Sequence, residues 1–143
     1  MENSKQCIML PDGTAVPSNC QINQVLYHVA SRGIEYDLIP WMKEHKVPVM
    51  AYCPLAQAGD LKQGLYENPV LIRIADAHRC TVSSILLAFV IQSGNVVAIP
   101  RTGNKHHALD NAKAWEVVLT EDELKEINQA FPAPVRKTYL NIV

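Results

Sequence analysis

The chain has 143 residues, of which 48% are hydrophobic, and its formal net charge at pH 7 is −1. This balance is typical of one globular domain with a sizeable core, and because the basic residues are not interleaved with aromatic ones, we expect no nucleic-acid binding. The longest apolar run, residues 85–91, is far shorter than the ~20 residues of a membrane span, so we expect no membrane partner. No C-x-x-C spacing and no secretory signal are present, which predicts reduced thiols and a cytoplasmic protein.

Residues 1–20 contain turn signals and no periodic apolar pattern, which predicts an irregular N-terminal segment in a loop conformation. Residues 22–27, with the sequence Ile-Asn-Gln-Val-Leu-Tyr, then predict a strand. Its two amides need hydrogen-bond partners, and the partner is either a ligand at the strand end or a neighbouring loop.

A helical pattern and a second strand follow. Residues 33–46 predict a packing helix with Asp37 as its N-cap. Residues 47–52 predict a strand, which ends before a glycine-containing loop that reaches Gly64. Cys53, at the end of this strand, is either a small packing residue, the commoner role, or a reactive thiol.

The middle of the chain predicts two consecutive helices. Pro69 begins an amphipathic run that extends to His78. Thr81 is placed as the N-cap of a second helix over residues 82–93, which is apolar nearly all round and therefore predicted to be covered on most sides. Gly94 suits the left-handed residue that ends such a helix.

Residues 96–99 predict a short buried strand, because they are four apolar residues that Pro100 ends. A turn containing Gly103 and Asn104 follows, and then a helix that runs through Trp115. The strand end therefore lies beside a helix N-terminus, where free N–H groups and the helix dipole favour an anion.

This turn also carries cationic and hydroxyl side chains. Arg101, Thr102 and Lys105 add donors that match phosphate. The residues by themselves indicate either a phosphate site or an ordinary strand–turn–helix connection with a solvated basic surface.

Near the C-terminus, Thr120 and Glu123 form the pattern of a capping box for a helix that runs to about Ala130. Prolines end this helix and leave residues 135–143 as a tail. Strands that alternate with helices imply parallel β-α units, so the fold class is α/β. The sequence has no G-x-G-x-x-G and no Walker motif, which argues against a Rossmann or P-loop domain.

Three strand motifs resemble those of the aldo-keto reductase family. The sequence at residues 23–28 resembles the family's sixth barrel strand, Ala-Tyr-Cys-Pro-Leu at 51–55 its seventh, and Ile-Pro-Arg-Thr at 99–102 its eighth. The resemblance implies a partial (β/α)8 TIM barrel, with about three parallel β-α units plus an appended C-terminal helix. Residues 21–134 would then be the C-terminal half of a reductase-like barrel.

The eighth-strand motif extends into the family's adenosine-phosphate segment, whose usual pattern is Ile-Pro-Lys-Ser followed by Arg, Glu and Asn. His107, Asp110 and Asn111 stand at the matching positions, six, nine and ten residues after Arg101. The resemblance implies that Arg101, Thr102 and His107 bind the 2′-phosphate of NADP(H), and that Asp110 and Asn111 bind the adenosine end. His107 is the weakest replacement, because a neutral imidazole binds phosphate less well than a guanidinium.

The same resemblance assigns residues to the nicotinamide end of the cofactor. Gln24 would bond the carboxamide, and Tyr52 would stack on the ring. Cys53 stands where the family usually has serine, Leu55 belongs to the same motif, and the loop at residues 57–60 would lie near the pyrophosphate.

The family's catalytic Asp, Tyr, Lys and His come from its first four strands, whereas this sequence begins after the fifth. Three β-α units cannot close an eight-stranded barrel. We therefore expect the cofactor-binding C-terminal part of an NADP(H)-dependent aldo-keto reductase, which reduces small carbonyl substrates, and no catalytic residue in this chain. The alternative is a non-catalytic half-barrel fragment that serves as an assembly or nucleotide-binding module.

An open partial barrel exposes two strand edges and an apolar inner face, which predicts self-association or pairing with an N-terminal half. We expect no metal site. His106 and His107 are adjacent and point about 100° apart on a helix, and the other histidines lack ligand spacing.

Overall fold

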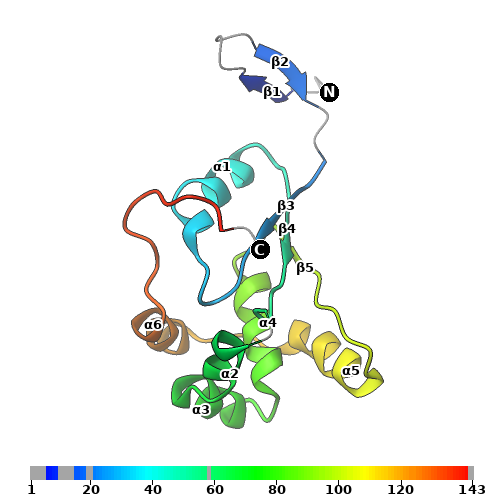
Figure 1. Cartoon of the computed structure of the whole chain (residues 1–143), viewed down its shortest axis with the longest axis vertical. Coiled ribbons are helices and arrows are strands. Elements are labelled where there is room, and N and C mark those ends of the chain that lie inside the picture. The colour runs from blue at the N-terminus through cyan, green and yellow to red at the C-terminus, as the bar shows by residue number, and fades with distance from the viewer. Residues whose placement is uncertain (1–5, 10–14, 19–20, 58, 142–143) are drawn as a thin grey trace.

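The computed structural model describes residues 6–9, 15–18, 21–57 and 59–141 (Figure 1). The strands are β1 (Gln6–Met9), β2 (Ala15–Ser18), β3 (Asn23–Leu26), β4 (Val49–Tyr52) and β5 (Val96–Ala98). The α-helices are α1 (Leu38–Glu44), α2 (Asp60–Tyr66), α3 (Pro69–Ala77), α4 (Val82–Gln92), α5 (Lys105–Lys113) and α6 (Glu121–Ala130). Two short 3₁₀ turns, η1 (Gly33–Glu35) and η2 (Ala114–Glu116), precede α1 and follow α5.

β1 and β2 pair as an antiparallel two-stranded sheet, which lies apart from the rest of the molecule in Figure 1. The prediction of an irregular loop is therefore wrong for residues 6–9 and 15–18. The strand sequences, Gln-Cys-Ile-Met and Ala-Val-Pro-Ser, show no apolar period, and their ladder is made by backbone groups. Pro17 fits here, because both strands of a two-stranded sheet are edge strands.

The second sheet is parallel and has the order β3-β4-β5. Its register pairs Gln24 with Met50 and Val49 with Val96. Asn95 fixes the start of β5 at a left-handed φ of 62°, and its side-chain amide donates to the Val47 carbonyl at 2.8 Å. The three parallel strands with helices between them confirm the predicted α/β class.

The two faces of this sheet differ in their cover. Val25, Val49 and Ala51 point to the helical side and are buried. Gln24 and Met50 alternate with them and therefore point to the opposite face. That face is only partly covered by the described residues, as expected for a sheet that does not close into a barrel.

The prediction that residues 96–99 form a buried strand is wrong in its burial. Val97 is 49% exposed and Ile99 is 39% exposed. β5 has β4 as its one strand neighbour in the described sheet, and Val97 lies on the sheet face that also carries Met50. An apolar run that is covered on both faces in a closed barrel is covered on one face here.

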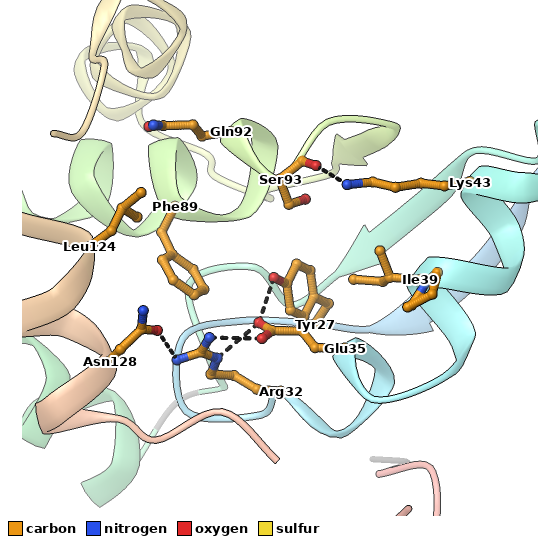
Figure 2. Close-up of a pocket in the computed structure, with 11 residues that line it drawn as sticks. Tyr27, Arg32, Glu35, Ile39, Lys43, Phe89, Gln92, Ser93, Leu124 and Asn128 are labelled. Carbon is orange, nitrogen blue, oxygen red and sulfur yellow. Dashed lines mark hydrogen bonds and ion pairs between the residues drawn. The ribbon is translucent and has the colours of Figure 1, made fainter. Parts of the chain in front are cut away.

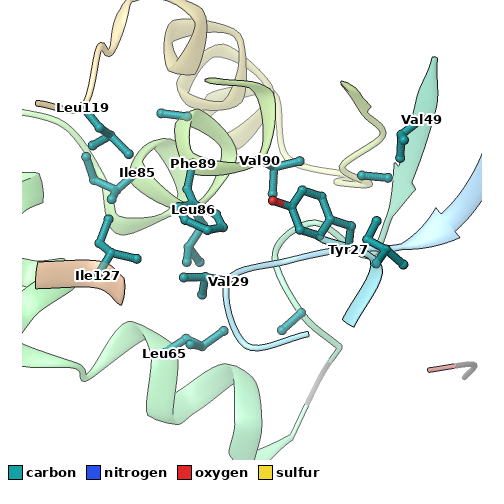
Figure 3. Close-up of a cluster of buried hydrophobic side chains, with 14 of the residues drawn as sticks. Tyr27, Val29, Val49, Leu65, Ile85, Leu86, Phe89, Val90, Leu119 and Ile127 are labelled. Atoms are coloured by element: carbon teal, nitrogen blue, oxygen red, sulfur yellow. The ribbon is translucent and has the colours of Figure 1, made fainter. Parts of the chain in front are cut away.

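α4 is the centre of the core (Figure 3). Its N-cap is Thr81, whose hydroxyl accepts a hydrogen bond from the Ser84 N–H at 3.2 Å, as predicted. Residues 84–90 are all buried, and Gly94 has the predicted left-handed φ of 73°. Among the described helices none alone is long and apolar enough to cross a membrane, although α3 and α4 together reach that length as a pair bent by 90°.

α6 packs against α3 through Ile127, which is fully buried. The predicted capping box is present: the Thr120 hydroxyl accepts from the Glu123 N–H, and the Glu123 carboxylate accepts from the Thr120 N–H. The side chain of Gln92 donates to the Leu119 carbonyl and accepts from the Leu119 N–H, each at 2.8 Å. These two bonds fix the segment before α6 on the end of α4.

α2 occupies part of the segment that the sequence predicted as a loop reaching Gly64. That prediction is wrong from Asp60 onward, since α2 runs over Asp60–Tyr66. Leu65 is 2% exposed and belongs to the core cluster, so tertiary packing outweighs the low helix propensity of Gly64.

The C-terminal tail folds back over the connection between β3 and α1. Lys137 forms an ion pair with Asp37 at 2.9 Å, and the Asn141 side-chain amide donates to the Ser31 hydroxyl at 2.7 Å. The tail approaches the chain most closely at Gly33, where an added Cβ would collide with the Thr138 hydroxyl. Asp37 occupies the predicted N-cap position of α1 but makes no side-chain capping bond.

Candidate functional site

A cavity of about 430 Å³ lies between the turn after β5, α5 and the first turn of α4. We call it the α5 cavity. It brings together six residues that the sequence analysis singled out, and they are Leu55, Arg101, Thr102, His107, Asp110 and Asn111. These residues come from three separate segments of the chain, which meet at the C-terminal end of β5.

The turn after β5 is ordered by its own side chains. The Thr102 hydroxyl accepts a hydrogen bond from the Asn104 N–H at 3.1 Å, and the Asn104 side chain caps α5 by accepting from the His106 N–H at 2.8 Å. No residue of α5 is buried. A hydrogen bond from the Ser84 hydroxyl to the Asp110 carbonyl, at 3.1 Å, ties this surface helix to α4.

The helical spacing of α5 explains which of its residues line the cavity. His107, Asp110 and Asn111 stand at positions i, i+3 and i+4, so they share one face of the helix. His106 lies outside the lining of the cavity. Arg101 and Thr102 approach the same space from the strand end.

A second cavity, of about 270 Å³, lies at the ends of β4 and β5, and we call it the strand-end cavity. Tyr52, Cys53, Leu55 and Arg101 all line it. Cys53 carries a free thiol and has a left-handed φ of 49°, a conformation that non-glycine residues rarely adopt. Such strain at a strand end is more frequent at ligand sites than elsewhere.

Gln24 lines neither cavity. It is exposed on β3, and the sheet register places it on the same face as Met50. Tyr52 is two residues further along β4 and shares that face. The structure thus puts Gln24 and Tyr52 on one face of the sheet and one strand apart, without joining them in a described cavity.

Sequence reasoning did not assign the other lining residues of the α5 cavity to a site. They are Lys62 and Tyr66 of α2 and, at the start of α4, Thr81, Val82 and Ser83. The Lys62 ammonium lies 5.6 Å from the centre of the Tyr66 ring, and the Tyr66 hydroxyl lies 2.7 Å from that of Ser83 in α4. The i, i+4 spacing of Lys62 and Tyr66 is the signal that could have found those two, but it is meaningful only in a helix, and this segment was predicted as a loop.

The largest of the cavities described here, about 520 Å³, lies between α1, α4 and α6 and contains none of the predicted site residues (Figure 2). Most of its polar groups are bonded to one another. The Arg32 guanidinium makes a two-bond contact with Glu35, at 2.8 and 2.7 Å, and donates to Asn128 at 2.7 Å. Burial and the Glu35 carboxylate raise the pKa of the Tyr27 hydroxyl, which donates to Glu35 at 2.8 Å. This network joins the β3–α1 connection to α6 and has a structural role.

Comparison with known proteins finds similar proteins in one family. The family model of the aldo/keto reductase family matches residues 15–131. Methylglyoxal reductase YeaE of Escherichia coli is 48% identical over 134 residues, which are 94% of this chain and 46% of that protein. The 9,11-endoperoxide prostaglandin H2 reductase of Trypanosoma cruzi is 30% identical over 76% of this chain and 36% of that protein.

A solved aldo-keto reductase of Klebsiella pneumoniae, in complex with NADPH, superimposes with a TM-score of 0.83 and 51% identity. The match covers 87% of this chain and 44% of that chain. This chain thus spans less than half the length of the relatives that it matches. Its three parallel strands and the helices between them correspond to part of the family's TIM barrel, and the chain belongs to the aldo/keto reductase family.

Proposed function

We propose that this chain is the cofactor-binding part of an NADP(H)-dependent aldo-keto reductase that reduces small aldehydes and ketones to alcohols. The observation that carries the proposal is the α5 cavity. Six residues that the family resemblance assigned to the cofactor come from three segments and line one space at the C-terminal end of a parallel strand. This edge of a parallel sheet is where α/β proteins bind their ligands.

The chemistry of the α5 cavity fits the adenosine end of NADP(H). Arg101 supplies a permanent positive charge and a planar set of donors for the 2′-phosphate, and the Thr102 hydroxyl and the His107 ring add further polar contacts. Asp110 and Asn111 supply acceptors and donors for the adenosine. The relative that was solved with NADPH supports this choice of cofactor.

The strand-end cavity fits the nicotinamide end. Tyr52 offers an aromatic face for the ring, and such stacking also selects which side of the ring faces the substrate. Gln24 shares the sheet face of Tyr52 and is proposed to bond the carboxamide. When bound, the cofactor supplies a hydride for a carbonyl carbon. The similarity to a methylglyoxal reductase favours small dicarbonyl compounds as substrates.

Titration of the purified chain with NADPH, followed by nicotinamide fluorescence, tests the proposal. We expect binding in the micromolar range, and the Arg101→Met variant should bind about 10 to 100 times more weakly, because a hydrogen bond to a charged group contributes roughly 1.5–3 kcal/mol. Lys125→Met is the matched control: it removes one exposed lysine outside both cavities and should leave binding unchanged. Binding that Arg101→Met does not weaken would overturn the assignment.

A second candidate is a nucleotide-binding or assembly module that carries out no turnover. The observation that favours it is the α5 cavity, whose Arg101 and Thr102 offer donors to a phosphate whether or not turnover follows. Mixing the chain with NADPH, methylglyoxal and an added N-terminal half of a relative separates the two functions, because only a cofactor-binding part of a reductase then completes an enzyme that oxidises the cofactor. Oxidation that requires an added N-terminal half of a relative would support the first proposal and show that the two parts pair.

A further inference from the structure

The parallel sheet has two free edges in the described part of the chain. Its order is β3-β4-β5, so β3 and β5 each have β4 as their one strand neighbour there. A free edge carries backbone N–H and C=O groups that no second strand pairs, and it therefore accepts another strand readily. β3 has the sequence Asn-Gln-Val-Leu and β5 has Val-Val-Ala. Neither contains the lysine or proline that proteins commonly place on an edge strand to prevent such pairing.

The sheet face turned away from the helices is uncharged over the strands. The register places Gln24, Met50 and Val97 on this face, and Tyr52 and Ile99 share it because each stands two residues further along the chain. None of these five side chains carries a charge. Two copies of this face therefore meet without the repulsion between like charges that keeps most protein surfaces apart.

Exposed large apolar side chains gather in the two parts of the chain that contain the free edges. We call these parts the β3 unit, residues 21–46, and the β5 unit, residues 96–118. Apart from those of the tail, the exposed large apolar residues are Ile22, Tyr36 and Trp41 in the β3 unit, Val97, Ile99, Leu109, Trp115 and Val118 in the β5 unit, and Leu61 and Ile72 between the two units. Figure 1 shows α1 of the β3 unit and α5 of the β5 unit on opposite sides of the sheet. The described structure is thus short of cover at both flanks, where a partner would supply it.

We propose that two copies of this chain pair through these edges, with β5 of each copy beside β3 of the other. A two-fold axis parallel to the strands produces both contacts at once, and every strand pair in the resulting six-stranded sheet is parallel. The sheet then closes on itself, so that the uncharged faces of both copies line its interior and none of its strands keeps a free edge. The same axis brings α1 of one copy toward α5 of the other. This inference goes beyond the proposed function, which concerns what a single copy binds.

Sedimentation velocity of the purified chain over a range of concentrations tests the pairing. We expect a dimer and no larger species, because a closed pair uses both edges of each copy. Val97→Glu places a carboxylate on the face that the pair buries and should weaken dimerisation at least about a hundredfold, since an unpaired charge is costly to bury. Gln24→Lys makes the same kind of change on the other edge strand and should have the same effect. Ile72→Glu is the matched control, because it puts a charge on an exposed apolar residue of α3 and should leave the dimer intact.

Three results would overturn the proposal. A monomer at all concentrations would show that the edges stay unpaired. Polymers that grow with concentration would show that the edges pair without closing. A dimer that survives both Val97→Glu and Gln24→Lys would use another surface, and circular dichroism checks that each variant is folded. NADPH titration is read separately, so a failed pairing leaves the proposed function untouched.

Competition identifies the edges independently of substitutions. An added N-terminal half of a relative offers parallel strands to the same two edges. We expect it to displace one copy and form a pair with the other. A complex that contains this half together with two copies of the chain would mean that the copies associate elsewhere, which would contradict the inference.

Discussion

α4 and α5 begin in the same way but serve different purposes. Each is capped by a side chain, Thr81 for α4 and Asn104 for α5. Residues 84–90 of α4 are all buried, whereas α5 has no buried residue. The comparison teaches that the core and the candidate site are separate in this molecule: α4 holds the fold together, and α5 presents polar side chains to a cavity at its surface.

The largest difference between the two helices is expected in stability. Leu86 of α4 is 1% exposed, and Leu109 of α5 is 59% exposed. Leu86→Ala should lower the free energy of unfolding by about 2–5 kcal/mol, since it leaves a cavity in the core. The matched change Leu109→Ala should stay within about 0.5 kcal/mol. Urea unfolding measures both, and equal losses would contradict the division between a core helix and a surface helix.

Helix caps provide a finer test of the same division. Thr120→Ala removes the cap of α6, which anchors Ile127 in the core, and should cost about 1 kcal/mol of unfolding free energy. Asn104→Ala removes the cap of α5 and should fray that helix with little effect on global unfolding, because α5 buries nothing. Hydrogen exchange of the α5 amides reports the local loss. A global loss of similar size in both variants would show that α5 is part of the cooperative core.

One substitution should strengthen NADPH binding in the α5 cavity and leave the core unchanged. His107→Arg restores the residue that is usual in the family pattern and places a permanent charge in the α5 cavity. We expect NADPH to bind about fivefold more tightly, because a guanidinium pairs with phosphate better than a neutral imidazole does. His106→Arg is the control, since His106 does not line the cavity. Equal gains from both changes would point to a general effect of net charge.

The smallest expected effect is on the stability of the fold at acidic pH. Partial burial raises the pKa of Glu123, but hydrogen bonds from Thr120 and His78 outweigh it, so the pKa lies below its ordinary value of 4.5. The folded state therefore binds a proton less readily than the unfolded state. The resulting stability is present above about pH 4.5 and is lost as the pH falls through the lower folded-state pKa.

Glu123→Gln should remove this part of the acid dependence, which amounts to less than about 1 kcal/mol of unfolding free energy. Unfolding midpoints measured from pH 6 down to about pH 3 show it. Glu121→Gln, which removes an exposed carboxylate from the same turn of α6, should leave the pH profile unchanged. Equal flattening by both variants would mean that general charge repulsion, not the capping box, sets the acid sensitivity.

Local signals in the sequence predicted much of the fold. Pro69, Thr81, Gly94 and the pair Thr120–Glu123 fix helix ends by backbone chemistry that acts over a few residues, and the structure places each of these ends as predicted. The alternation of strand and helix patterns along the chain predicted the parallel sheet, because it too is read from consecutive segments of the sequence. The failed predictions lie where long-range packing decides, as in α2, whose Leu65 is held by the core in spite of Gly64.

By itself, the sequence determined the fold class, the ends of α3, α4 and α6, the family resemblance and the spacing that puts His107, Asp110 and Asn111 on one helix face. Only the tertiary structure decided that these residues share a cavity with Arg101 and with Lys62. It also decided that β5 is half-exposed and that the tail packs over Gly33. The physical reason is range: caps, turns and periodicity act between near neighbours in the chain, whereas a cavity forms between segments that meet only when the chain has folded.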